Sequence, residues 1–276
     1  MSRQPVDLCA HINQTVERGH PADFPVGLVR VYHERDGAYE QLPHRLAVTR
    51  LDTGQVLAVV SDRYELVPHQ RVLDLVEQTI APLDVGPVPR GVFVDRQGSR
   101  MRAIFKFPAL ARPVLHGDDI CPCLKIQNTY DGTSRIAIHI GAFRFVCTNL
   151  AVGGGGVFAG GFMSVHAGEI PLKKVAEQLA SYLKDFEAIV ALYGFWARQP
   201  LNGEALAIIL EFLPVRAGEA IRQRIDERKT TTVYAAYNVA TDYATHETRS
   251  FRTAFELLAQ VNQRFQACFP GPAPAA

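Results

Sequence analysis

The spacing of apolar residues divides the chain into a strand-rich part and a helix-rich part. Up to about residue 150, apolar and polar residues alternate in short runs that are separated by glycine-containing turns. This alternation is typical of antiparallel β-hairpins. The predicted turns are Thr53-Gly54, Gln97-Gly98 and Asp131-Gly132. Within residues 45–67, we expect a third short extended piece after the first hairpin.

Helical spacing occurs first in residues 69–80, where the apolar residues recur on one face and Pro82 ends the helix. From Pro171 onward the whole chain shows apolar residues at three- and four-residue intervals. The helices predicted there cover 171–195, 203–213, 215–228, 232–246 and 250–267. A short amphipathic helix is also expected at 5–18.

These elements predict an α+β fold, an antiparallel β-sheet built from hairpins with a packed helix, followed by a C-terminal helical part. We expect a strand-rich part over 1–168, a helical part over 169–268 packed on it in one unit, and a disordered tail over 269–276. The boundary is a run of glycines between Gly153 and Gly161. Its spacing is neither that of a P-loop nor that of a dinucleotide-binding loop. A flexible loop is therefore expected, with a phosphate cradle as the alternative.

The strands separate basic from apolar side chains. In residues 100–107, Arg100, Arg102 and Lys106 share one face, because side chains alternate along a strand. A three-residue loop over 131–133 preserves this separation in the next hairpin, since it pairs Lys125 with His139 and Ile126 with Ile138. A β-bulge at Gly141 would then move Phe143 and Phe145 to the core and Arg144 to the polar face.

The expected result is a sheet with one apolar face and one basic face whose inner positions hold no acidic residue. The members of the basic face are Arg100, Arg102, Lys106, Lys125, Arg135, His139 and Arg144. A solvated polar face is common in antiparallel sheets, but such faces usually mix charges. A site for single-stranded nucleic acid combines a positive groove with aromatic stacking platforms, and Tyr130 at the hairpin tip is the candidate platform.

Three segments show a resemblance to a known family. They are RLDTGQVLAVVSDRYELV, LKIQNTYDGTSRIAIHIGAFRFVCTNL and TTVYAAYNVATDYATHETRS. In this order they resemble the phage/plasmid-like protein family, also called domain of unknown function 932, over residues 42–260. The most specific matches are Asn128, Asp131-Gly132, Arg144, Cys147 and Asn149. The resemblance implies a product of phages, plasmids or mobile islands and brings no established catalytic residues.

The order of hairpin, helix and further hairpins is also loosely similar to that of single-strand-annealing recombinases of the radiation-repair type. This likeness concerns only the order of the secondary-structure elements and carries no information about functional residues.

Composition limits the partners and the compartment. The 29 basic and 28 acidic residues give a net charge of +1, so any nucleic-acid site must come from a local arrangement of charge. No window is apolar enough for a signal peptide or a membrane span. Five cysteines, an odd number without a framework spacing, suit free thiols in a reducing compartment. We therefore expect a cytoplasmic protein with no membrane association.

Catalytic and metal sites are weakly indicated. Cys121-Pro-Cys123 lacks the second pair that a zinc site needs, so we expect neither a metal nor a cofactor. Asp118 and Asp119 could hold Mg²⁺ in a nuclease, although a charged loop before a strand explains them as well. Tyr234, Tyr237, Asn238 and Thr241 form a stripe that suits core packing with a polar rim.

Three functions stay open at this point. The first is a non-enzymatic protein that binds or anneals single-stranded DNA, as an oligomer of like subunits. The second is a metal-dependent nuclease or nucleotide-processing enzyme. The third is a protein-interaction factor of a mobile element.

Overall fold

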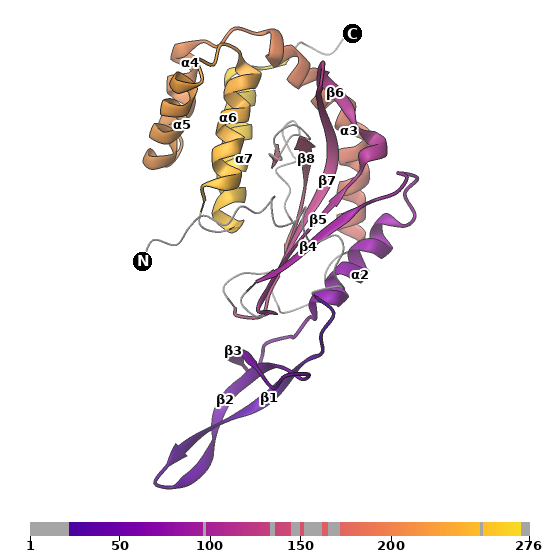
Figure 1. The fold of residues 1–276 in the computed structure, drawn as a ribbon, viewed down its shortest axis with the longest axis vertical. Helices are drawn as coiled ribbons and strands as arrows, with labels where there is room; N and C mark the ends of the chain where they lie inside the picture. Colours follow the sequence, from indigo (N-terminus) through magenta and orange to yellow (C-terminus); the bar gives the residue numbers. More distant parts are fainter. Residues whose placement is uncertain are drawn as a thin grey trace.

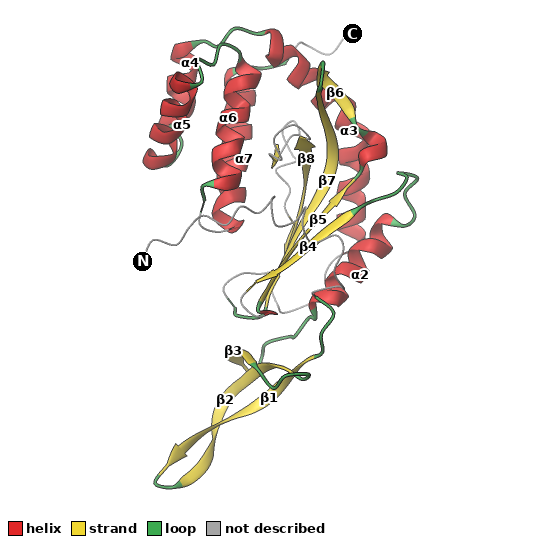
Figure 2. Cartoon of the chain, in the orientation of Figure 1, coloured by secondary structure: helices red, strands yellow, loops and turns green. Residues whose placement is uncertain are grey.

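The computed structural model describes residues 22–95, 98–132, 136–144, 150–151, 162–164, 172–248 and 251–271. The described chain forms two antiparallel β-sheets and a set of helices that follow them in sequence, which confirms the predicted α+β class (Figures 1 and 2). The helix expected at 5–18 lies outside the described residues. No helix among the described residues is long and apolar enough to cross a membrane.

The first sheet, here called the arm, has three strands in the order β1-β2-β3. They are β1 (Val26–Arg35), β2 (Ala38–Arg50) and β3 (Val56–Ser61). Figure 1 shows the arm projecting from one end of the molecule. The turn at Gly54, with φ at 72°, confirms the predicted hairpin. The extended piece expected after the hairpin forms no strand at 64–68, and the third strand of this sheet is β1, upstream of the hairpin.

The second sheet has seven strands, all joined by antiparallel pairing. They are β4 (Arg90–Asp95), β5 (Arg100–Lys106), β6 (Arg112–Leu115), β7 (Asp118–Thr129), β8 (Ile136–Arg144), β9 (Leu150–Ala151) and β10 (Phe162–Ser164). The main path is β10-β8-β7-β5-β4, with β6 beside β7 and β9 beside β8.

The register of β7 and β8 is the one expected from the alternation of side chains. Lys125 pairs with His139 and Ile126 pairs with Ile138, which confirms the predicted register, while residue 133 of the predicted loop lies outside the described residues. The bulge expected at Gly141 was wrong, because regular pairing continues to the end of β8.

Without the bulge, Phe143 lies on the face of Lys125, and Arg144 lies on the opposite, apolar face. Phe143 and Arg144 each make a stabilising contact on the face where they lie. The ammonium of Lys106 lies 3.9 Å from the centre of the Phe143 ring, and Arg144 forms an ion pair with Asp118. Phe145 lies outside the described residues.

Two helices cover the apolar face of the second sheet, α2 (His69–Ile80) and α3 (Leu172–Arg198). The side chain of Asn128, on that face, reaches the start of α2. Figure 1 shows α2 and α3 along one side of the sheet. Helix α6 (Val233–His246) packs on α3 and brings Tyr234 to the Arg144 end of this face. The predicted helix over 69–80 is therefore confirmed in its limits and in its packing.

The remaining helices are α4 (Gly203–Glu211), α5 (Val215–Glu227), α6 (Val233–His246) and α7 (Phe251–Cys268), close to their predicted limits. Side-chain oxygens cap two of them, since Asn202 accepts from the Glu204 N–H at 2.9 Å and Thr232 accepts from the Ala235 N–H at 3.3 Å. After α7, Phe269 is buried and its carbonyl accepts from Trp196 Nε1 at 2.7 Å. The chain is thus anchored through Phe269, and 272–276 lie outside the described residues.

Candidate functional site

The register defines a polar face of the large sheet, which is the side that carries Lys125. Its inner positions are Arg100, Arg102, Ile104 and Lys106 on β5, Cys121, Cys123, Lys125, Gln127 and Thr129 on β7, and Ala137, His139, Gly141 and Phe143 on β8. None of these positions is acidic. On β4, Phe93 pairs with Arg102 and adds an aromatic ring to the same face.

The three cations of β5 are half-buried at alternate positions of one strand. Arg100 Nε donates to Asp131 Oδ2 at 2.7 Å, next to the tip of the following hairpin. The Lys106 ammonium lies over the buried Phe143 ring in a cation–π contact. These three side chains lie along β5, between β4 and β7, and each is partly exposed to solvent.

Lys125 and His139 lie side by side on the polar face, as predicted, but they are only 6% and 9% exposed. Burial, and then the neighbouring Lys125 ammonium, lower the pKa of His139 to about 3. The imidazole is consequently neutral at physiological pH. In this conformation neither residue belongs to an exposed basic surface, which corrects that part of the expectation.

Arg144 lies on the opposite face of the sheet, which corrects its assignment to the basic face. Its Nε and Nη2 donate to the two carboxylate oxygens of Asp118 at 2.5 and 2.6 Å. The guanidinium carbon is also 5.7 Å from the centre of the Tyr234 ring. A bidentate pair of this kind is strong and geometrically specific. Arg135, another predicted member of the basic face, lies outside the described residues.

Tyr130 is fully buried, so it is no exposed platform for a base in this structure. Its ring stacks on the ring of His69 with 4.0 Å between centroids, and its hydroxyl oxygen accepts from the His69 backbone N–H at 2.7 Å. Burial raises the pKa of the Tyr130 hydroxyl well above its usual value. A residue at a hairpin tip was expected to be exposed, but here the arm and α2 meet at that tip.

Asn128 and His69 form a fully buried pair next to Tyr130. Asn128 Nδ2 lies 3.0 Å from the Val67 carbonyl oxygen and 3.0 Å from His69 Nδ1, while His69 Nε2 lies 3.0 Å from the Gly98 carbonyl oxygen. A carbonyl oxygen only accepts hydrogen bonds. Asn128 therefore donates to Val67 through its NH₂ group, and the ring proton of His69 is on Nε2, which donates to Gly98. Nδ1 is then the acceptor, so His69 is held as one neutral tautomer.

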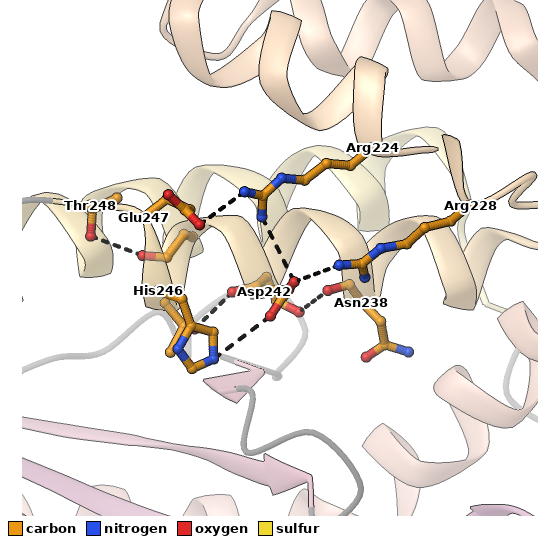
Figure 3. A network of polar contacts seen from close by, with 10 residues as sticks. Arg224, Arg228, Asn238, Asp242, His246, Glu247 and Thr248 are labelled. Carbon is orange, nitrogen blue, oxygen red and sulfur yellow. Dashed lines mark hydrogen bonds and ion pairs between the residues drawn. The ribbon is translucent and has the colours of Figure 1, made fainter. Parts of the chain in front are cut away.

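A polar network between α5 and α6 was not predicted from sequence (Figure 3). Arg228 Nη2 donates to Asp242 Oδ2 at 3.1 Å, and His246 Nε2 lies 3.7 Å from Asp242 Oδ1. Arg224 Nη2 donates to Glu247 Oε1 at 2.9 Å, and its Nη1 lies 3.8 Å from Asp242 Oδ2. The i, i+4 spacing of Asp242 and His246 was the available signal. The network joins α5 to α6.

The tyrosines of α6 are core residues, as the stripe indicated. Tyr234 and Tyr237 are buried, and the hydroxyl oxygens of Tyr237 and Tyr193 lie 3.1 Å apart. Tyr237 also donates to Asn262 Oδ1 at 3.3 Å. These contacts join α3, α6 and α7.

The nuclease alternative finds little geometric support. Asp118 is held by Arg144, and Asp119, the next residue of β7, points to the opposite side of the strand. Burial raises the pKa of the Cys121 thiol to about 11, and Cys121 and Cys123 are both free. In the part of the chain that the structure describes, no three His, Cys, Asp or Glu side chains converge as metal ligands would.

Comparison with known proteins assigns a family but no activity. A family described as "Domain of unknown function (DUF932)" matches residues 56–267. No curated protein and no solved structure matches the chain. The match extends from the last strand of the arm to the end of α7, so it includes the second sheet and the helices that pack on it. The chain belongs to the domain of unknown function family DUF932.

Proposed function

We propose that this protein binds single-stranded nucleic acid along a cationic track on β5. The track consists of Arg100, Arg102 and Lys106, with Phe93 of β4 beside Arg102. The observation that carries the proposal is the alternation itself, which puts three cations on one face of β5, where Arg100 at the start of the strand also pairs with Asp131. The buried Lys125 and His139 lie deeper on the same face and are not part of the track.

The spacing of the track suits an extended anionic polymer. Alternate residues of a strand lie about 6.7 Å apart, so Arg102 and Lys106 are separated by about 13 Å. A flexible single strand can adapt to such a row, whereas a duplex presents a rigid, helical array of phosphates. Phe93 is half-buried and packs against the main core, and a base that stacked on the exposed part of its ring would be bound with little dependence on sequence.

Binding of this kind carries little sequence information. Contacts from Arg and Lys to phosphate fix position on the strand but do not distinguish bases. With a net charge of +1, the protein has no overall field that would attract nucleic acid, so loss of the track should remove most of the binding.

The natural setting follows from the sequence. Free thiols at Cys121, Cys123 and Cys268 support a reducing compartment, and we place the protein in the cytoplasm. The resemblance of three segments to the phage/plasmid-like family supports a role on single-stranded DNA of a mobile element. Catalysis is not part of the proposal.

A binding assay tests it. The protein is titrated into fluorescently labelled oligo-dT and into a duplex of the same length, at low salt, and anisotropy is measured. The test variant carries Arg102→Gln and Lys106→Gln, which remove charge and keep polar side chains. The control carries Lys173→Gln and Lys174→Gln, exposed cations at the start of α3. We expect at least tenfold weaker binding for the test variant only.

Absence of binding by the folded wild type would refute the proposal. Equal weakening by the control would show that the cations act through bulk charge and that the track is misplaced. A circular dichroism melt of each variant separates loss of binding from loss of fold.

A further inference from the structure

The inner face of the arm carries a small core, and the outer face carries exposed apolar side chains around two buried central residues, Ala47 and Thr49, which are 5% and 8% exposed. Val48 and Val60, on the inner face, form a small core with Tyr130 that is separate from the main core. Large hydrophobic side chains are nevertheless exposed on the arm. Among the described residues, seven of the eleven exposed large hydrophobic side chains belong to it. These are Leu28, Val29, Tyr32, Tyr39, Leu51, Val56 and Val59.

Four of these side chains gather on the outer face of the arm. The face is built from two cross-strand rows, Val29–Ala47–Val59 and Gly27–Thr49–Val56. The side chain of Leu51 lies over Gly27 and extends the patch beyond the second row. Val29, Leu51, Val56 and Val59 are 43% to 58% exposed, and neither row contains a charged residue. Soluble monomers rarely leave a contiguous apolar patch on the middle of a sheet face without a partner.

The charges around the patch favour a particular kind of partner. Arg50 pairs with Asp52 at 2.6 Å, and His44 lies 2.7 Å from Asp62, so both signs are present and already compensated within the arm. A nucleic acid or an anionic membrane would need a basic rim. A neutral apolar patch with a balanced rim is complementary to itself, which is what a two-fold interface requires.

We propose that the outer face of the arm packs against the same face of a second copy of this chain. The axis lies between the two rows and across the strands, so that the Val29–Ala47–Val59 row of each copy covers the Gly27–Thr49–Val56 row of the other. Two sheets packed in this way lie about 10 Å apart with nearly aligned strands.

This arrangement produces a specific electrostatic contact. Arg45 is exposed and shares the outer face with Ala47, two residues away along β2. The two-fold axis near the middle of β2 brings Arg45 of one copy to the Leu51–Asp52 end of the other. Each dimer would therefore contain two symmetric contacts in which Arg45 of one copy approaches the Asp52 carboxylate of the other, which also accepts from Arg50 of its own chain. The interface lies on the arm and does not depend on nucleic-acid binding by β5.

Sedimentation equilibrium of the full chain tests the interface. We expect the wild type to show a mass of twice 30.5 kDa at micromolar concentration. Val59→Glu should give a folded monomer with a circular dichroism spectrum like that of the wild type, because this exposed side chain supports contacts only in the dimer. Val215→Glu on α5 is the matched control, since Val215 is even more exposed but lies outside the arm, and it should remain a dimer.

A charge exchange tests the orientation. Arg45→Glu and Asp52→Arg should each weaken the dimer at least tenfold, and the double variant should recover most of the loss. A monomeric wild type at 100 μM, or a dimer that survives Val59→Glu, would overturn the proposal. So would equal dissociation by Val215→Glu, and failure of the double variant to recover would overturn the two-fold arrangement.

Discussion

Asn128 donates a hydrogen bond from Nδ2 to Nδ1 of His69 across 3.0 Å, and thereby joins the large sheet to the first turn of α2. The same amide group donates to the Val67 carbonyl, just before the helix. Asn128 is one of the residues on which the family resemblance rests. The structure gives it a role in holding the arm, α2 and the sheet together.

We predict that Asn128→Ala lowers the free energy of unfolding by about 2–4 kcal/mol, because His69 Nδ1 and the Val67 carbonyl lose their donor in a buried site. Urea unfolding followed by circular dichroism measures the change. Gln78→Ala, at an exposed position of α2, is the control and should change stability by less than about 0.5 kcal/mol. A loss for Asn128→Ala no larger than that of the control would show that the pair contributes nothing.

The Arg144–Asp118 pair leads to a second prediction. Both side chains are largely buried, so removal of one partner leaves an uncompensated charge and should cost about 3 kcal/mol or more. Arg144→Met and Asp118→Leu should each destabilise the protein strongly, whereas the double variant should lose clearly less than the sum. Additive losses in this double-mutant cycle would mean that the two groups do not interact.

His139 should make stability depend on pH. Its pKa is lowered to about 3 in the folded protein and lies near 6.5 in the unfolded chain. Between these values only the unfolded chain binds the proton, so stability should fall as pH drops from about 6.5 toward 3, by on the order of 4 kcal/mol in total. Urea unfolding at pH 7 and pH 4.5 measures the change.

His139→Gln should flatten this dependence, and His33→Gln on the exposed arm should not. Lys125→Met removes the second cause of the shift, so the pKa of His139 in the folded protein should rise and the total loss of stability at low pH should become smaller. An identical pH dependence in the wild type and in His139→Gln would rule out His139 as the titrating group.

The thiols should differ in reactivity. A raised pKa leaves little thiolate on Cys121 at pH 8, and Cys121 and Cys123 are buried, whereas Cys268 is half-buried. Iodoacetamide labelling resolved by peptide mass spectrometry should modify Cys268 before Cys121 and Cys123, which should react only in urea. Early modification of Cys121 in the native protein would contradict its burial.

The sequence predicted local features better than long-range partners. The alternation of polar and apolar side chains was enough to predict that Lys125 pairs with His139. A shift of the strand register by one residue would have mixed the polar and apolar faces of the sheet. Arg144 was misplaced because the predicted bulge at Gly141 is absent, and its partner Asp118, 26 residues upstream, could not be recognised from the strand pattern. The burial of Tyr130 also depends on a distant partner, His69, which alternation cannot reveal.

The arm shows the same limit. Its hairpin was predicted from β2, β3 and the turn at Gly54, but β1 was missed because charged and polar residues interrupt Val26–Arg35 on both faces. The burial of Lys125 and His139 could not be read from the strand pattern either, since alternation assigns a face but does not show what covers it.

The salt dependence of binding to oligo-dT tests the central claim most directly. Each neutralised phosphate contributes a slope of about 0.7, so the three cations of the track predict a slope near −2 for the logarithm of the association constant against the logarithm of salt concentration. In the Arg102→Gln and Lys106→Gln variant the slope should shrink to about −0.7, and in the Lys173→Gln and Lys174→Gln control it should stay near −2. A wild-type slope near zero, or an unchanged slope in the track variant, would contradict the account.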